Sequence, residues 1–169
     1  KWNNLTETST AENTVIVQPL IKTKWGQGQY YNSQCPTGGS LTANALTGCV
    51  ATTMAQIMYY WSFPIREQTT LATAVDNDPS DGISGTFTTQ VGGGYHWGNM
   101  STQLNQFSTP VEVAEVANLM YDCGVAADMN YGFGASGATD YHASHGMHNF
   151  FGYEAPYIYL KEDFSTSEW

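Results

Sequence analysis

One stretch, residues 47–61, limits most strongly what this chain can fold into, because its apolar residues repeat with the period of a helix. Apolar side chains stand at positions i, i+4, i+7, i+8 and i+11 of this stretch: Val50, Met54, Ile57, Met58 and Trp61. This spacing places them on one face of an α-helix and predicts that the face packs against a core.

Cys49 lies at the start of this predicted helix, and its position allows two roles. Thr47 is the expected N-cap, which puts Cys49 in the first turn. Unpartnered backbone N–H groups and the positive end of the helix dipole favour a thiolate there, and the thiolate is the nucleophilic form. Cysteine is also among the most buried residue types, and most lone cysteines fill core space. Position alone leaves both roles open.

Composition indicates a globular chain with few cationic groups. The 169 residues are 41% hydrophobic and 12% charged, which suits one domain with a sizeable core. We expect residues 1–14 to form a loose leader and residues 15–169 to belong to that domain. Five Lys+Arg against 15 Asp+Glu give a net charge of −10, so nucleic acid is excluded as a partner. No apolar run approaches the ~20 residues of a membrane span.

Two further helices are predicted. Residues 109–112 read as a capping box with proline at the first helical position, and Gly124 is the expected end of that helix. Its predicted buried stripe consists of Val113, Val116, Ala117, Met120 and Cys123. Residues 139–151 form the next predicted helix, with Ala143, Met147, Phe150 and Phe151 on its apolar face and Gly152 as its stop.

Three histidines lie on the polar side of this last helix. His142, His145 and His148 stand at i, i+3 and i+6, roughly opposite the apolar face. No carboxylate or cysteine completes a ligand set at a suitable spacing. We therefore expect no metal and no cofactor.

The segments between the helices read mostly as loops. Residues 35–46 are rich in Gly, Thr, Ser and Asn, and residues 65–94 read as surface loop with β-like pieces and a possible hairpin. Residues 157–160 resemble a strand. Whether Cys35 and Cys123 form a disulfide is left open by their spacing.

Three stretches together are similar to the streptopain family of secreted bacterial cysteine peptidases. Thr47-Gly48-Cys49-Val50-Ala51-Thr52 resembles the nucleophile helix of that family, and residues 124–132 resemble its Gly-Val-x-x-x-Met-x-Tyr-Gly segment. Residues 95–100 resemble its aromatic-Asn-Met turn, where His96 is expected to serve packing or hydrogen bonding. The resemblance implies an α+β, papain-like fold, a secreted or cell-surface bacterial location, and peptide or protein substrates.

The resemblance also implies site residues. Cys49 is the implied nucleophile, and Gln27 the side-chain amide that binds the oxyanion together with a backbone N–H group. A surface glutamine in a turn is the plain alternative, and Gln29 competes for the role. The implied substrate cleft contains the neighbours of Cys49 and a small-residue wall, against a plain flexible loop as the alternative: Gly48, Val50, Gly134, Ser136, Gly137 and Ala138. An apolar substrate side chain next to the scissile residue is implied as well.

The family pattern lacks one component here. A papain-like enzyme places its histidine base ~130–150 residues after the cysteine, which from Cys49 falls beyond Trp169. No histidine of this chain has the expected glycine-rich context. We therefore expect mainly the helical half of a papain-like domain, with the β-rich half largely absent and the histidine on a separate or missing C-terminal part of the same enzyme. An inactive, degenerate copy is the other explanation.

A function of another class also fits the composition. Eleven Tyr and five Trp residues could form flat contact surfaces, so a non-enzymatic secreted binding module is the alternative.

Overall fold

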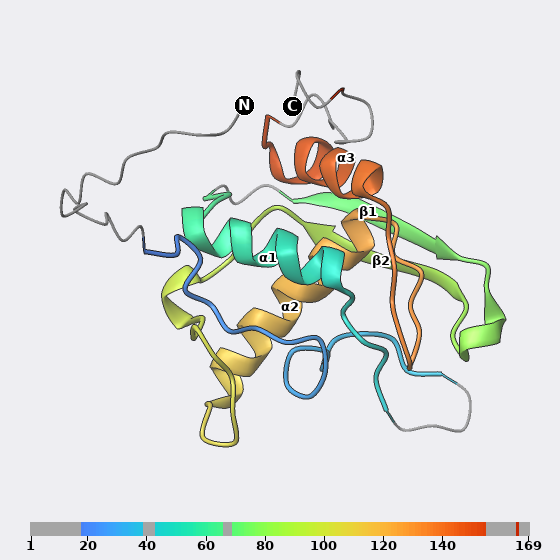
Figure 1. Ribbon diagram of the computed structural model, residues 1–169, viewed down its shortest axis with the longest axis horizontal. Helices are drawn as coiled ribbons and strands as arrows, with labels where there is room; N and C mark the ends of the chain where they lie inside the picture. The colour runs from blue at the N-terminus through green and yellow to red at the C-terminus, as the bar shows by residue number, and fades with distance from the viewer. Residues whose placement is uncertain (1–17, 39–42, 66–68, 155–164, 166–169) are drawn as a thin grey trace, which may run out of the picture.

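A computed structural model describes residues 18–38, 43–65, 69–154 and 165 (Figure 1). In chain order its elements are α1 (Cys49–Trp61), β1 (Thr70–Asp76), η1 (Pro79–Asp81), β2 (Gly85–Val91), η2 (Trp97–Asn99), α2 (Pro110–Ala126) and α3 (Asp140–Phe151). The predicted leader at 1–14 and the predicted strand at 157–160 lie outside the described residues.

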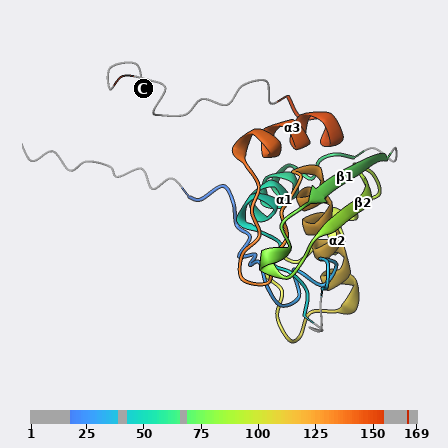
Figure 2. The same cartoon turned by 90° about the vertical axis from the view of Figure 1, so that its right-hand side faces the viewer.

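Helix α2 is the central element of the fold. It contacts α1, α3 and both strands, and Figures 1 and 2 show these elements gathered around it. Its capping box is formed as predicted: the Thr109 hydroxyl accepts from the Glu112 N–H, and the Glu112 carboxylate accepts from the Thr109 N–H. The helix continues to Ala126, past the predicted end at Gly124. Gly124 serves packing instead, because a Cβ there would collide with the Tyr131 hydroxyl.

The hairpin is confirmed and is more than a surface loop. β1 and β2 pair antiparallel, from Thr70 opposite Val91 to Asp76 opposite Gly85. Alternate residues of β1 are buried, ending with the carboxylate of Asp76, which accepts from the Tyr131 N–H at 2.8 Å. A two-stranded sheet is marginal alone, so its packing on α2 stabilises it.

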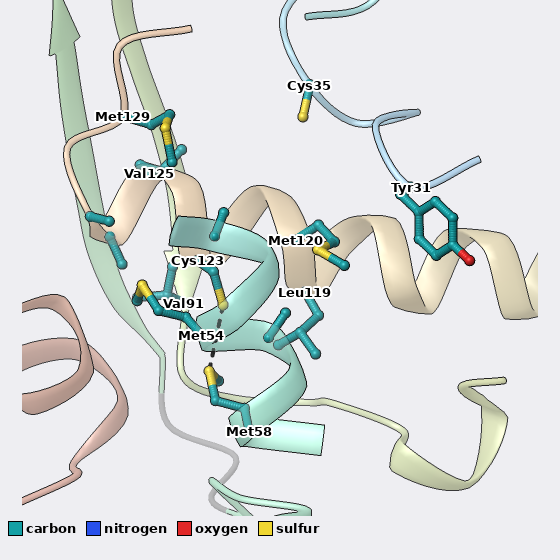
Figure 3. Packing of buried hydrophobic residues seen from close by; sticks show 14 of the residues in the cluster. Tyr31, Cys35, Met54, Met58, Val91, Leu119, Met120, Cys123, Val125 and Met129 are labelled. Atoms are coloured by element: carbon teal, nitrogen blue, oxygen red, sulfur yellow. Dashed lines mark hydrogen bonds between the residues drawn. The ribbon is translucent and has the colours of Figure 1, made fainter. Parts of the chain in front are cut away.

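Helix α1 forms where predicted but buries a different face. Ala51, Met54, Ala55 and Met58 are buried, whereas Ile57 is 37% exposed and Trp61 66% exposed. The prediction of Ile57 and Trp61 as core residues was therefore wrong. Two alanines on the buried face present little bulk to α2, and the Met58 and Cys123 sulfur atoms meet at 3.5 Å (Figure 3).

The N-cap of α1 also differs from the prediction. Gly48, with φ of 83°, is the capping residue, and it makes no side-chain cap. The hydroxyl of Thr47 instead shares a 3.1 Å hydrogen bond with that of Thr52, which donates to the Gly48 carbonyl at 2.9 Å. The buried Thr47 side chain thus stabilises the turn that precedes α1.

Helix α3 begins and ends as predicted. The Thr139 hydroxyl accepts from the His142 N–H, and Gly152 closes the helix in the left-handed conformation. Gly146 lies against α2, because a Cβ there would come within 2.6 Å of the Ala126 carbonyl oxygen. The absence of a side chain at this position allows the two backbones to approach closely.

The three cysteines are free thiols, so Cys35 and Cys123 form no disulfide. Both are buried and lie apart in the packed interior (Figure 3). Burial raises the pKa of the Cys35 thiol to about 12 and that of Cys123 well above its ordinary value. Cys49, in contrast, is exposed.

Candidate active site

Cys49 opens onto a pocket between α1 and α3. The pocket has a volume of about 460 Å³. It is lined by Cys49, Val50, Thr53, Met54, Ile57, Asp140, Ala143, Ser144, Met147, Tyr153 and Glu154. Cys49 is the first residue of α1, where backbone N–H groups have no partner within the helix. A thiol in this place is accessible to a reagent or a substrate.

Gly48 fixes the chain immediately before Cys49. A Cβ at Gly48 would lie 2.9 Å from the Met129 sulfur and 3.0 Å from the Ser136 carbonyl oxygen. Its positive φ is also one that residues with side chains rarely adopt. Glycine is therefore required here for both space and conformation, and the predicted substrate-binding residue Gly48 is buried beneath the site.

Gln27 lies beside the same turn. The Gln27 carbonyl oxygen accepts from the Thr47 N–H at 3.0 Å. This hydrogen bond holds the Gln27 backbone against Thr47, which stands two residues before Cys49. Gln29, the competing residue, is exposed. The structure thus brings Gln27 to the helix start, while the role of its side-chain amide stays a prediction.

The predicted small-residue wall packs against the segment that leads to Cys49. The Ser136 hydroxyl donates to the Leu46 carbonyl at 2.7 Å and accepts from the Gly132 N–H at 3.0 Å. Asn130 and Gly137 exchange two backbone hydrogen bonds of 2.9 Å. Ser136 is buried and holds the loop in place.

The other wall residues are more accessible. Gly134 and Gly137 are exposed, and Ala138 is partly buried. Gly137 and Ala138 line a second pocket of about 470 Å³, whereas Val50 lines the Cys49 pocket. Of the predicted residues, Cys49 and Val50 therefore line one cavity, whereas Gly137 and Ala138 line another.

The contribution of α3 was missed in the sequence. Asp140, Ala143, Ser144 and Met147 stand at i, i+3, i+4 and i+7, so one face of α3 forms the wall opposite α1. Ala143 and Met147 were recognised as an apolar face, but no sequence signal indicates that this face lines a cavity together with Asp140 and Ser144.

Comparisons with known proteins agree with this arrangement. The model of the peptidase C10 family matches residues 25–169. The chain belongs to the peptidase C10 family. Streptopain from Streptococcus pyogenes is 27% identical over 191 residues, an alignment that covers all of this chain and 47% of that protein. The thiol protease/hemagglutinin PrtT from Porphyromonas gingivalis is 27% identical over 139 residues, covering 80% of this chain and 15% of that protein.

Solved structures of another peptidase share the fold. Active interpain A cysteine protease from Prevotella intermedia has a TM-score of 0.69 and 35% identity, covering 79% of this chain and 54% of that chain. Prointerpain A from the same organism has a TM-score of 0.68 and 33% identity, covering 79% and 42%. The predicted α+β, papain-like fold is thus confirmed. The chain spans about half the length of the streptopain it matches.

None of the four histidines of this C10 chain lines the Cys49 pocket. His96 pairs with Glu115 at 2.9 Å, His148 contacts the Tyr153 carbonyl at 3.0 Å, and His145 contacts the Asn149 amide at 3.0 Å. The hydrogen-bonding role expected for His96 is confirmed.

The described residues contain no group of three His, Cys, Asp or Glu side chains placed to hold a metal ion. Within the same residues, no helix has the length and apolar character that a bilayer crossing requires.

Proposed function

We propose that this chain supplies the nucleophile and the oxyanion hole of a secreted bacterial cysteine endopeptidase. The observation that carries the proposal is the exposure of Cys49 at the first position of α1, in a pocket wide enough for a substrate side chain. Cys35 and Cys123 are buried and have no comparable access.

In the proposed reaction the Cys49 sulfur attacks the carbonyl carbon of a peptide bond. The oxyanion that forms is bound by the Cys49 backbone N–H and the Gln27 side-chain amide. Collapse of the tetrahedral intermediate breaks the C–N bond and leaves a thioester acyl-enzyme, which water then hydrolyses. The small-residue wall, with Gly134, Gly137 and Ala138 at its surface, would border the bound peptide backbone.

The proton steps require a histidine from another segment. A base must take the thiol proton and later protonate the leaving amine, and the four histidines of this chain do not line the pocket. We place that histidine on a C-terminal part of the same enzyme, which is consistent with coverage of 47% of streptopain.

Alkylation tests the nucleophile. With the histidine-bearing segment present, iodoacetamide near pH 7 should label Cys49 stoichiometrically and several-fold faster than N-acetylcysteine, because the imidazole takes the thiol proton. The variant Cys49→Ala, which retains both other thiols, is the matched control. Labelling of Cys49 at the rate of N-acetylcysteine in the presence of that segment would reject the proposal.

Slow labelling would favour the alternative, a binding module with an aromatic surface. Tyr60 and Trp61 pack edge to face with ring centroids 5.0 Å apart and are 42% and 66% exposed. Flat exposed rings of this kind suit contact with glycans or proteins.

A further inference from the structure

The peptide group between Gly48 and Cys49 carries the backbone N–H of the proposed oxyanion hole. In a trans peptide the N–H and the C=O point in opposite directions, so the contacts that hold the Gly48 oxygen also direct the Cys49 N–H. Cys49 is the first residue of α1, and its N–H has no acceptor within the helix. The direction of this donor therefore depends on what binds the Gly48 oxygen.

Two donors of Thr52 hold the Gly48 oxygen. The Thr52 N–H donates to it at 3.1 Å, and the Thr52 hydroxyl donates to it at 2.9 Å. Hydrogen bonds in a chain polarise one another, so a carbonyl that accepts two of them makes its own peptide N–H a stronger donor. Thr52 thus both orients and strengthens the Cys49 N–H.

A second buried hydroxyl directs the first. Thr52 has a single O–H group, which donates to Gly48, so in the 3.1 Å contact between the two threonines the Thr47 hydroxyl is the donor. Thr47 is fully buried and Thr52 is 8% exposed, and hydrogen bonds are stronger in such low-dielectric surroundings. The Thr47 N–H also donates to the Gln27 carbonyl at 3.0 Å. Thr47 therefore connects the two hydroxyls to the residue that is proposed as the other oxyanion donor.

Thr53 shows how this arrangement differs from that of an ordinary helical threonine. Its hydroxyl donates to the Cys49 carbonyl at 2.9 Å, the usual bond of a helical threonine to the residue four positions earlier. That side chain is exposed. Thr52 makes the same bond inside the protein, directed by Thr47, and makes it to the peptide group that carries the proposed oxyanion donor.

We propose that the hydroxyls of Thr47 and Thr52 position the Cys49 N–H for the oxyanion, with Thr52 as the positioning residue. The inference rests on the peptidase function proposed above. Negative charge develops on the substrate carbonyl oxygen in the tetrahedral intermediate, and a donor that is already directed at this place needs no reorganisation when the charge forms. Neither threonine lines the Cys49 pocket, so both act through the peptide group.

A contrast between hydrolysis and alkylation tests the proposal. Peptide hydrolysis passes through an oxyanion, whereas alkylation by iodoacetamide displaces iodide from a saturated carbon and forms none. Thr52→Val keeps the shape of the side chain and removes the hydroxyl. In the enzyme that includes the histidine-bearing segment, Thr52→Val should lower kcat on a fluorogenic peptide about 5- to 30-fold, less than loss of a whole oxyanion donor costs. KM and the rate of Cys49 alkylation should change by less than about twofold, because neither depends on the oxyanion.

Two further variants assign the effect to the hydroxyls. Thr52→Ser is the matched control, because it retains the hydroxyl and loses only a methyl group, and its kcat should stay close to that of the unmodified enzyme. Thr47→Val interrupts the chain one step further from the peptide group and should lower kcat by a smaller factor than Thr52→Val. If Thr52→Val does not fold, Thr47→Val decides, and an unchanged kcat in that variant overturns the proposal.

The outcomes separate the two proposals. An unchanged kcat in Thr52→Val overturns this inference and leaves the peptidase function standing. The inference also fails if alkylation slows as much as hydrolysis, since the variant then acts on the thiol, or if Thr52→Ser loses as much kcat as Thr52→Val, since the methyl group is then responsible. Alkylation of the unmodified enzyme no faster than that of N-acetylcysteine overturns the peptidase function, and the inference falls with it.

Discussion

At the scale of single residues, the position of Cys49 depends on the glycine that precedes it. Gly48 has φ of 83° and ψ of 147°, a combination that is nearly restricted to glycine. Its α-carbon also lies too close to Met129 and Ser136 to carry a methyl group. Cys49 is therefore preceded by a backbone conformation that no other residue type can adopt without strain.

Gly48→Ala should destabilise the fold by about 2–4 kcal/mol, because backbone strain and steric overlap add together. Urea unfolding measures the loss. Gly134→Ala is the matched control, since a Cβ there meets nothing within 4 Å and its φ is not positive, so its effect should lie within about 1 kcal/mol. Equal losses in both variants would contradict the proposed constraint.

The three thiols should differ sharply in the native protein. Iodoacetamide should modify Cys49 alone, because Cys35 and Cys123 are buried and their pKa values are raised by desolvation. Peptide mapping by mass spectrometry assigns the modified residue, and denaturation in urea should expose all three thiols. Modification of Cys123 in the folded chain would show that the core in Figure 3 is not packed as described.

At the scale of elements, a buried carboxylate joins α2 to β2. Asp122 accepts from the Thr89 hydroxyl and from the Tyr95 hydroxyl, both at 2.7 Å. Burial raises the pKa of Asp122 to about 6, against the lowering effect of these two hydrogen bonds. The charged form is thus disfavoured in the folded state relative to the unfolded chain.

The pH dependence of stability follows from this shift. Because the folded state binds the Asp122 proton more tightly, its contribution is fully present below about pH 4 and is lost as pH rises through about 6. The contribution is about 2–3 kcal/mol. Urea unfolding between pH 3.5 and 7 should show this fall in the difference between the unmodified chain and Asp122→Asn; a difference that stays constant would contradict it.

The elements that were predictable are those determined by local chemistry. The Thr109–Glu112 capping box and the Gly152 stop involve groups within a few residues of one another, so their sequence signals were sufficient. The buried face of α1 was not predictable in the same way. Its orientation depends on α2 and α3, which lie far away in the sequence, and Ile57 therefore borders a pocket although its spacing indicates core.

The candidate site was predictable to a similar extent. The family resemblance predicts that Gln27 and the loop at 134–138 lie near Cys49. The structure joins both to the segment before Cys49: the Gln27 carbonyl accepts from the Thr47 N–H, and the Ser136 hydroxyl donates to the Leu46 carbonyl. The wall formed by α3 needed the structure, because which face of a helix meets a cavity depends on tertiary packing. Asp140 was therefore overlooked as part of the site.

At the scale of the whole molecule, this chain spans about half the length of the streptopain it matches. In the mechanism proposed above, a histidine from another segment must reach the Cys49 pocket. Exposed apolar residues on α1, with Trp61 at 66% and Ile57 at 37%, leave a surface on which such a segment could pack.

Recombination with that segment should restore catalysis. A general base contributes typically 10²–10⁴-fold to rate, so the chain together with the histidine-bearing polypeptide should hydrolyse a fluorogenic peptide at least about 10²-fold faster than the chain alone. The same polypeptide with its histidine replaced by alanine is the control. A single active species with the mass of this chain would contradict the need for a second segment.

The contact between Gly146 and the Ala126 carbonyl has a consequence for substrate choice. Because Gly146 has no side chain, α3 packs close to α2. This close packing determines the width of the Cys49 pocket, one wall of which is α3. The width of the pocket beside Cys49 thus depends on the missing side chain of Gly146, a residue that does not line the pocket. A substitution at Gly146, which lies behind the pocket wall, would therefore change which side chains fit beside Cys49.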